Sequence, residues 1–279
     1  MIETVRELSD LRQRIAQWKR DGQRIGFVPT MGNLHAGHLA LVHQALENAD
    51  RVVTSIFVNP TQFGPTEDFA RYPRTIEADT RQLDAGGCDL LWLPSVATMY
   101  PLGVDATVRV SVPGISDSLE GEHRPGHLDG VATVVARLLN QVQPDVAVFG
   151  CKDYQQLAVV RYMVRDLAFP VEIIGASTVR EADGLAMSSR NQYLTQEQRP
   201  LAAGIFECLQ WMRASVQGGV AFAEVEAGAT QRLQSAGFAA DYAAIRQRDL
   251  EMPAQGALVA LVAARLGGTR LIDNLEFES

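Results

Sequence analysis

The stretch that most constrains the fold is residues 24–43, because it changes from an apolar run to a helical repeat within a few residues. The apolar run 25–28 suits a buried strand, and we expect Pro29 and Gly32 to end it. From Leu39 onward, apolar side chains recur at helical spacing. The stretch therefore predicts a strand, a turn and a helix, the unit from which parallel α/β sheets are built.

The turn in this stretch is a candidate anion site. In a parallel sheet it lies at the carboxyl end of a strand, where ligands bind, and the free amides of a helix start favour negative charge. His35 and His38 lie three residues apart, so both imidazoles can face one ligand, and Gly37 lets that ligand approach closely. Two neutral imidazole donors suit a phosphate whose charge grows in a transition state. The alternative is a partly exposed polar residue, which we expect for His43 on the same helix.

Length, charge and cysteine content narrow the class of protein. A chain of 279 residues exceeds the usual size of one core, so one large domain and one smaller domain are expected. A net charge of −8 argues against a general nucleic-acid surface, so cations for an anionic substrate must be supplied locally. Three cysteines in no metal-binding pattern indicate a reducing compartment. Without a signal-peptide pattern or a membrane-length apolar run, we expect a cytoplasmic protein.

Further apolar runs and helical repeats extend the parallel sheet. Strands are predicted at residues 52–58, 90–93, 108–112, 146–149 and 171–176, and helices at residues 9–20, 75–85 and 127–143. The polar stretch between Gly114 and Gly130 predicts a mobile and functional loop. Arg124 and His127 in that stretch could contact an anion, and a solvated loop tip is the alternative for each.

Amide side chains follow one of these strands. Asn59 and Gln62 come directly after the strand 52–58, and hence beside the histidine turn. Because an amide donates and accepts at once, the two residues can orient a substrate. The alternative is that they only satisfy the backbone of the loop.

Cationic and polar side chains follow two other strands. Gly150 ends one strand, and Lys152 and Asp153 then open a helix, which repeats the arrangement of the histidine turn. Gln156 lies one turn further along that helix and can face the same ligand as Gln62. Residues 188–190, Ser-Ser-Arg, combine two hydroxyl groups with a guanidinium and can hold a polyphosphate.

The pattern changes beyond Thr195, where helices are followed by consecutive strands. The helices are predicted at residues 196–216 and 222–236, and the strands at residues 241–246, 257–264 and 270–275. This order predicts a small α+β unit rather than more parallel sheet. We place the domains at residues 1–185 and 186–279.

Seven motifs occur together, in one order along the chain. They are Pro-Thr-Met-Gly (29–32), His-Ala-Gly-His (35–38), Asn-Pro-Thr-Gln-Phe (59–63), Tyr-Pro-Arg-Thr (72–75), Arg-Pro-Gly-His (124–127), Lys-Asp-Tyr-Gln-Gln (152–156) and Met-Ser-Ser-Arg-Asn (187–191). Jointly they resemble the pantothenate synthetases, or pantoate–beta-alanine ligases, over residues 5–275. The His-x-Gly-His element alone is shared with cytidylyltransferases and class I aminoacyl-tRNA synthetases.

The resemblance implies a fold and a reaction. It implies a Rossmann-like nucleotidyltransferase domain, a smaller C-terminal domain that closes over the site, and a homodimer. Pantoate and ATP would give pantoyl adenylate and pyrophosphate, after which the amine of β-alanine would give pantothenate and AMP. Magnesium would accompany the ATP.

The resemblance also implies residue roles. His38 matches the proton donor, and His35 matches its partner on the phosphates. Lys152 and Arg190 complete the implied catalytic set. The residues matched to the ATP site are Met31, Gly32, Asn33, Leu34, His35, Ala36, Gly37, His38, Gly150, Cys151, Lys152, Asp153, Val179, Met187, Ser188, Ser189 and Arg190.

The remaining matches concern the other substrates and the metal. Gln62 and Gln156 match residues that hold pantoate, with Gln62 also near β-alanine and Asn59 nearby. Asp79 and Gln82 match residues near the magnesium.

Two departures and two rival functions accompany the resemblance. Cys151 stands where the family usually carries Glu or Gln, and Asn33 replaces a more usual Ala; neither change removes a matched side chain. The nearer rival is a cytidylyltransferase, which would release a nucleotide-linked product instead of AMP. The more distant rival is a catalytically silent nucleotide- or RNA-binding protein, which the acidic charge disfavours.

Overall fold

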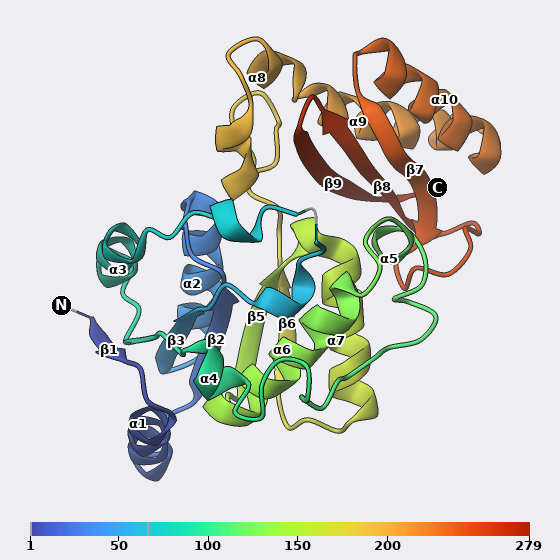
Figure 1. The fold of residues 1–279 in the computed structure, drawn as a ribbon. Helices are drawn as coiled ribbons and strands as arrows, with labels where there is room; N and C mark the ends of the chain where they lie inside the picture. The colour runs from blue at the N-terminus through green and yellow to red at the C-terminus, as the bar shows by residue number, and fades with distance from the viewer. Residues whose placement is uncertain (1, 66) are drawn as a thin grey trace. The chain divides into compact units, whose positions relative to one another are not determined.

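The computed structural model describes residues 2–65 and 67–279, which form two compact units with separate sheets (Figure 1). Unit 1 consists of Met1–Cys151 and Val159–Ser177, and unit 2 consists of Lys152–Ala158 and Thr178–Ser279. The chain therefore passes between the units more than once. The domain division at residue 185 stays a prediction.

Unit 1 is built on a six-stranded sheet in the order β1-β4-β3-β2-β5-β6, with every pairing parallel. The strands are β1 (Glu3–Val5), β2 (Ile25–Thr30), β3 (Arg51–Ile56), β4 (Leu90–Trp92), β5 (Val146–Gly150) and β6 (Glu172–Ala176). Because β3 and β5 flank β2, the strand order reverses beside β2. The carboxyl ends of β2 and β5 thus form a topological switch point, where ligands bind in such sheets. The α/β fold class with a parallel sheet is confirmed.

Helices cover the sheet of unit 1 in two groups. The helices up to residue 166 are α1 (Leu8–Arg20), α2 (Ala36–Asn48), α3 (Ile76–Ala85), α4 (Val96–Met99), α5 (Glu120–His123), α6 (His127–Val142) and α7 (Tyr154–Asp166). Helix α2 packs on β2, β3 and β5 and contacts α3, whereas α1 and α6 pack on each other and on β2. A buried cluster that includes Val28, Val42 and Val148 fills the space between α2 and the sheet.

Two expectations for unit 1 were wrong. Residues 108–112 form no strand: Val108 is 74% exposed, and the backbone N–H of Val110 donates to Oγ1 of Thr133 on α6 instead of to a strand. Alternating apolar residues predict a strand only where a partner edge exists. Strand β2 continues through Pro29 to Thr30, and its pairing with β5 is already over at Phe27, so the missing N–H of Pro29 disrupts no bond there.

Unit 2 combines helices with a three-stranded antiparallel sheet in the order β7-β8-β9. Its elements are α8 (Gln198–Leu201), α9 (Gly204–Gln217), α10 (Phe222–Ser235), β7 (Ala239–Gln247), β8 (Ala257–Leu266) and β9 (Thr269–Glu278). The helix expected at residues 196–216 is interrupted at Ala202 and Ala203, between α8, which contains Pro200, and α9, which begins at Gly204. The predicted change from parallel sheet to α+β structure is confirmed.

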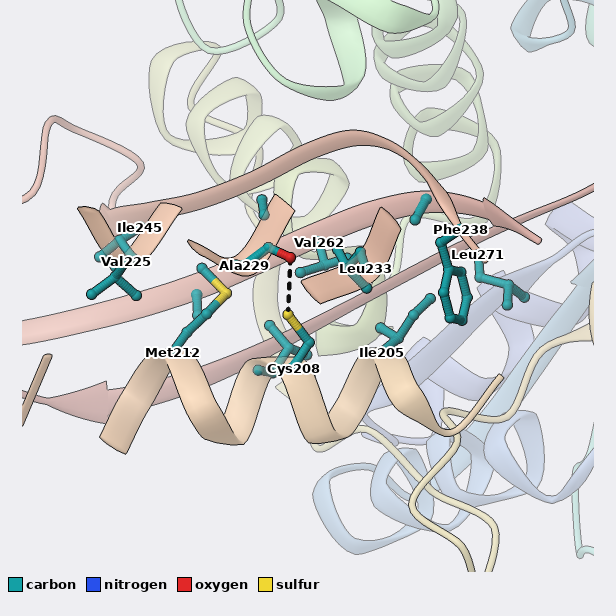
Figure 2. Close-up of a cluster of buried hydrophobic side chains, with 14 of the residues drawn as sticks. Ile205, Cys208, Met212, Val225, Ala229, Leu233, Phe238, Ile245, Val262 and Leu271 are labelled. Carbon is teal, nitrogen blue, oxygen red and sulfur yellow. Dashed lines mark hydrogen bonds between the residues drawn. The ribbon is translucent and has the colours of Figure 1, made fainter. Parts of the chain in front are cut away.

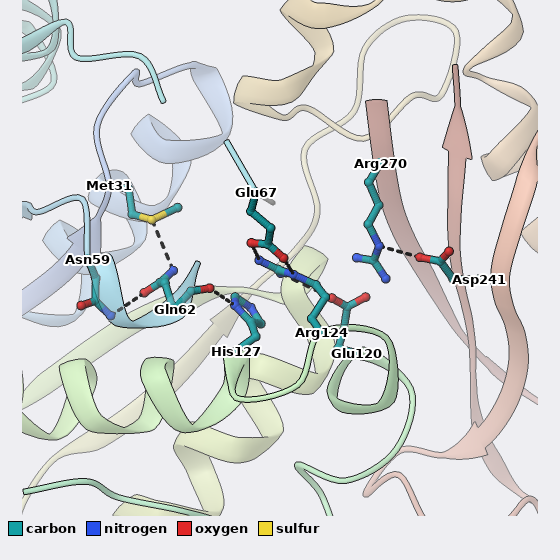
Figure 3. A network of polar contacts seen from close by, with 9 residues as sticks. All are labelled: Met31, Asn59, Gln62, Glu67, Glu120, Arg124, His127, Asp241 and Arg270. Atoms are coloured by element: carbon teal, nitrogen blue, oxygen red, sulfur yellow. Dashed lines mark hydrogen bonds and ion pairs between the residues drawn. The ribbon is translucent and has the colours of Figure 1, made fainter. Parts of the chain in front are cut away.

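The helices and the sheet of unit 2 share one apolar core (Figure 2). Leu209 and Met212 of α9 are fully buried in it, and the Cys208 thiol donates to the carbonyl of Ala229 on α10 at 3.7 Å. At the sheet, Nε of Arg270 on β9 donates to Asp241 on β7 at 2.7 Å (Figure 3). In the described chain, no helix has the length and apolar character needed to cross a membrane.

Candidate active site

The turn between β2 and α2 contains two consecutive residues with positive φ, Gly32 at 84° and Asn33 at 52°. Glycine is needed at position 32 because of this backbone conformation, and because a Cβ there would lie 2.9 Å from Cγ2 of Ile56. The turn lets α2 begin at Ala36, shortly after β2 ends at Thr30. The predicted strand, turn and helix are therefore confirmed, with the turn at the switch point of the sheet.

His35 and His38 cap the start of α2 reciprocally. Nδ1 of His35 accepts from the N–H of Gly37 at 3.2 Å, and Nδ1 of His38 accepts from the N–H of His35 at 3.3 Å. A ring nitrogen that accepts a hydrogen bond carries no proton, so each neutral imidazole has its proton on Nε2. The ring centroids lie 4.1 Å apart. The start of α2 thus holds two Nε2–H donors beside the positive end of a helix dipole.

Two residues of α3 bond to the backbone of the same turn. The carboxylate of Asp79 accepts from the N–H of Asn33 at 3.0 Å and from the N–H of Leu34 at 2.9 Å. The hydroxyl of Thr75 donates to both carboxylate oxygens at 3.1 Å. Nε2 of Gln82 donates to the carbonyl of Leu34 at 3.4 Å. Asp79 and Gln82, predicted to lie near magnesium, are therefore engaged by protein groups.

These contacts bear on whether α3 holds a metal ion. Magnesium takes oxygen ligands in octahedral geometry and keeps several water molecules. Asp79 is 1% exposed and already accepts bonds at both oxygens, so it does not fit as a direct magnesium ligand. Nowhere in residues 2–65 and 67–279 do three or more His, Cys, Asp or Glu side chains form a group that could hold a metal.

Asn59 and Gln62 lie together after β3 (Figure 3). Nδ2 of Asn59 donates to Oε1 of Gln62 at 3.0 Å, and Nε2 of Gln62 donates to Sδ of Met31 at 3.3 Å. Both amides are buried, with exposed fractions of 0% for Asn59 and 8% for Gln62. Because Met31 belongs to the β2–α2 turn, the structure brings the amide pair and the histidine turn together.

Tyr100 and Gly130 hold this amide pair from other elements. The hydroxyl of Tyr100 donates to Oδ1 of Asn59 at 2.6 Å, and the carbonyl of Gly130 on α6 accepts from Nδ2 of Asn59 at 3.2 Å. A Cβ on Gly130 would lie 2.4 Å from the carbonyl oxygen of Thr61, so only glycine allows this approach of α6. Tyr100 is not predicted as a site residue from the sequence, because its only local signal is an aromatic residue before a proline.

His127 contacts the amide pair as well. Its Nδ1 donates to the carbonyl of Gln62 at 2.8 Å, a contact that requires the ring to keep its proton on Nδ1 (Figure 3). The pKa of His127 is lowered to about 4, mainly by burial and to a smaller extent by the positive charge of Arg124. His127 is thus a neutral donor that supports the Gln62 backbone at neutral pH.

Arg124 belongs to an ion-pair network and not to a solvated loop tip. Its Nε and Nη2 donate to the two carboxylate oxygens of Glu67 at 2.7 Å each, and its Nη1 lies 3.6 Å from Glu120. The Arg124 side chain is 12% exposed. The loop-tip alternative is therefore wrong for Arg124, which holds the polar segment that precedes α6.

Gly150 and Cys151 lie at the carboxyl end of β5, beside β2. Cys151 is half-buried and forms no disulfide. Burial raises the pKa of the other two thiols, Cys88 and Cys208, to about 11. The thiols of Cys88 and Cys208 are therefore harder to ionise than an ordinary thiol.

The Lys152 backbone is held by β9 within unit 2. Its carbonyl accepts from Nδ2 of Asn274 at 2.9 Å. The carboxylate of the neighbouring Asp273 accepts hydrogen bonds from Nη1 and Nη2 of Arg180 at 2.6 and 3.0 Å. The Arg180 guanidinium also lies 3.8 Å from the ring centroid of Phe206. Burial raises the pKa of Asp273, and the hydrogen bonds from Arg180 oppose that rise. The sequence signal that could have revealed this cluster is the Asp-Asn pair between the apolar residues 271–272 and Leu275.

The predicted Ser-Ser-Arg element lies beside Val179 in unit 2. The N–H of Met187 donates to the carbonyl of Val179 at 3.0 Å. Oγ of Ser188 accepts from the N–H of Arg190 at 3.3 Å and caps a 3₁₀ helix that begins at Ser189. The structure thus brings these residues together around one loop.

The predicted site residues fall in both units. Asp153 and Gln156 belong to unit 2 and are half-buried, whereas Gln62 belongs to unit 1. The pairing of Gln62 with Gln156 stays a prediction.

Comparisons with known proteins agree with this arrangement. The model of the family described as "Pantoate-beta-alanine ligase" matches residues 3–276. The chain is 65% identical to the pantothenate synthetase of Xanthomonas euvesicatoria pv. vesicatoria (strain 85-10) over 280 residues, which covers 99% of this chain and 100% of that protein. It is also 65% identical to the pantothenate synthetase of Xylella fastidiosa (strain 9a5c) over 281 residues, with the same coverage of both chains.

Two solved structures resemble the fold. The pantothenate synthetase of Thermus thermophilus superposes with a TM-score of 0.91 at 48% identity, covering 98% of this chain and 99% of that chain. The pantoate-beta-alanine ligase of Francisella tularensis, described as complexed with beta-gamma ATP and beta-alanine, gives a TM-score of 0.84 at 33% identity and covers 99% and 97%.

Proposed function

Since the chain belongs to the pantoate–beta-alanine ligase family, we propose which of its residues carry each step of that family's reaction. The enzyme condenses pantoate with β-alanine in an ATP-dependent reaction, through pantoyl adenylate, and releases pyrophosphate, AMP and pantothenate. The match over nearly the whole chain favours this function over a cytidylyltransferase.

The adenylation and condensation steps require stabilisation of negative charge and need no nucleophilic side chain of the protein. A pantoate carboxylate oxygen forms a bond to the α-phosphorus of ATP, and the bond from that phosphorus to pyrophosphate breaks. In the second step the β-alanine amine attacks the acyl carbon and AMP leaves. Negative charge grows on phosphate oxygens during the first step, so aligned donors and cations are the required parts.

The reciprocal cap of His35 and His38 is the observation that carries the proposal. Nδ1 of each imidazole accepts a hydrogen bond from a backbone N–H, so the proton of the neutral ring lies on Nε2, which becomes the donor. We assign these donors to the ATP phosphates, with His38 placing a proton toward the leaving pyrophosphate. The backbone of residues 31–38 forms the rest of the turn that receives the nucleotide.

Cations for the phosphates come from residues matched by sequence. We assign Lys152 and Arg190 to the phosphates because a chain of net charge −8 must supply positive charge locally. The backbone and side chains at residues 150–153, Val179 and residues 187–189 complete the proposed ATP contacts.

The acid and amine substrates are assigned to amide side chains. We assign pantoate to Gln62 and Gln156, with β-alanine near Gln62 and Asn59. The buried contact of Gln62 with Met31 supports this, because it ties the amide pair to the nucleotide turn. The Francisella tularensis relative, whose structure is described as complexed with beta-gamma ATP and beta-alanine, supports the same pair of ligands here.

Three further features belong to the proposal. Magnesium enters as part of the MgATP substrate, bound through the phosphate oxygens. The enzyme acts as a homodimer, which sedimentation equilibrium would test. It works in the cytoplasm, where reducing conditions suit three cysteines that form no disulfide.

Pantoate-dependent exchange of labelled pyrophosphate into ATP, with magnesium present and β-alanine absent, tests the proposal. Exchange shows that an acyl adenylate forms reversibly before the amine arrives. Absence of exchange in protein that binds ATP would refute pantoate as the acid.

A pair of substitutions at one position tests the histidine role. His38→Asn keeps an acceptor at the Nδ1 position but has no donor at the Nε2 position, so we expect a loss of at least ~10²-fold in exchange. His38→Gln places its amide nitrogen where Nε2 was, so it retains more activity than His38→Asn. His43→Asn, on the exposed side of the same helix, is the matched control. Equal rates in all three variants would remove His38 from the mechanism.

A further inference from the structure

Two side chains of α3 hold the backbone of one residue in the β2–α2 turn, Leu34, from both sides of its Cα. Asp79 accepts the N–H of Leu34 at 2.9 Å, and Gln82 donates to the carbonyl of the same residue at 3.4 Å. Leu34 directly precedes His35, whose side chain caps α2. The α3 pair therefore acts on the residue that sets the position of the reciprocal histidine cap.

The conformation of the turn explains why it needs such a clamp. Gly32 and Asn33 both have positive φ, and this conformation has a steric cost at Asn33 because that residue carries a Cβ. Asp79 also accepts the N–H of Asn33 at 3.0 Å. A carboxylate that receives two successive backbone amides holds this strained turn in one conformation, and charge-assisted bonds of this kind are the stronger ones.

The contacts of Asp79 leave it no place as a direct metal ligand. Both oxygens of Asp79 accept bonds from the turn and from Thr75, and the side chain is 1% exposed. A magnesium ion would have to displace the turn amides and bring its water molecules into a closed space. Gln82 uses its amide nitrogen for the bond to the turn, and this bond orients its side chain toward the Leu34 carbonyl.

We infer that Asp79 and Gln82 are positioning residues, which fix the Leu34 backbone and through it His35 and His38, and that neither ligates the metal. The inference rests on the proposed role of the histidines at the phosphates. It replaces the sequence-based assignment of both residues to magnesium with a mechanical one.

Magnesium titrations of the exchange reaction distinguish the two roles. In Asp79→Asn, an amide nitrogen faces one of the turn N–H groups, so the turn shifts and we expect exchange to fall ~10- to 100-fold. The magnesium concentration for half-maximal exchange should change by less than about twofold, and excess magnesium should not restore the rate. A rise of about tenfold or more in that concentration, with recovery at high magnesium, would overturn the inference.

Gln82→Glu separates the roles in the opposite direction. The substitution adds a carboxylate, so a metal ligand would keep or strengthen magnesium binding. In the positioning role the donor to Leu34 is lost and a negative charge faces its carbonyl, so exchange falls. Unchanged exchange with a lower magnesium requirement in Gln82→Glu would refute the inference. Glu77→Gln, which removes a charge from the exposed side of α3, is the matched control.

The nitrogen NMR signals of the histidines report the clamp without any catalysis. In the wild type and in Glu77→Gln, His35 and His38 should show Nδ1 as the unprotonated nitrogen at neutral pH. In folded Asp79→Asn, at least one of them should change its Nδ1 signal. Unchanged signals together with slow exchange would refute the positioning role. Absence of exchange in the wild type would instead count against the proposed function, while the NMR comparison would still decide the inference.

Discussion

Replacing His127 by asparagine tests how the amide pair is supported. In the folded protein, Nδ1–H of His127 donates to the carbonyl of Gln62 at 2.8 Å, and burial lowers its pKa from 6.5 to about 4. The charged groups that face the ring are Arg124, Glu120 and Glu67. The unfolded chain therefore binds a proton at His127 in a pH range where the folded protein does not.

The sign and size of the effect follow from this difference. Above about pH 6.5 both states are neutral at His127, so the full stability is present. As the pH falls toward 4, the unfolded state gains protons first, and the free energy of unfolding declines by up to about 3 kcal/mol, since each pKa unit is worth about 1.4 kcal/mol. At about pH 4.5 the loss from this residue alone is about 2.5 kcal/mol.

Urea denaturation from about pH 7.5 to about pH 4.5 measures the effect. Asparagine places its amide nitrogen where Nδ1 was, so His127→Asn keeps the donor to Gln62 and removes the titration. The free energy of unfolding of the variant should fall less than that of the wild type, by about 2.5 kcal/mol at the acid end. Because all carboxylates are common to both proteins, a difference between them that stays constant with pH would refute the argument.

Three other substitutions have definite expected outcomes. A Cβ on Gly130 would lie 2.8 Å from Cα of Gln62, so Gly130→Ala should raise the KM for pantoate and destabilise the fold by roughly 1–3 kcal/mol; a wild-type KM in steady-state assays would contradict this. Leu209 is 0% exposed in the core of unit 2, so Leu209→Ala should lower the free energy of unfolding by about 2–5 kcal/mol in chemical denaturation. A decrease below about 1 kcal/mol would contradict this, because it would mean that the core closes around the cavity. Tyr100→Phe removes one donor to Oδ1 of Asn59, but the N–H and the hydroxyl of Thr61 still donate to that oxygen. The free energy of unfolding should therefore fall by only about 0.5–1.5 kcal/mol. A larger loss in thermal unfolding would contradict this expectation.

Local patterns made most of the fold predictable from the sequence. The strand, turn and helix around residues 24–43 follow from an apolar run, turn residues and a helical repeat, all of which act over a few neighbouring residues. The change to α+β structure after Thr195 was visible for the same reason. The expected strand at residues 108–112 was wrong because its alternation says nothing about whether a neighbouring strand edge is available.

The sequence proposes residues for the candidate site but does not predict the contacts between them. His35 and His38 are separated by one helical turn, so their shared direction follows from spacing alone. The bonds of Asp79 to the turn, and of Asn274 to the Lys152 carbonyl, join segments that are far apart in the chain. No local pattern encodes such contacts, because they depend on how whole elements pack. The resemblance to a known family pointed to Asp79 and Gln82 on α3 as residues near magnesium, and it did not predict their bonds to the turn.

The three thiols are unequally buried, so the native protein offers one cysteine, Cys151, for selective labelling. At neutral pH, Cys88 and Cys208 stay protonated inside their cores, whereas half-buried Cys151 stands at the end of β5, next to Lys152. A maleimide dye should therefore attach at one position without any engineering of the sequence. If residue 151 contacts ATP as proposed, fluorescence from that dye would report nucleotide binding in real time.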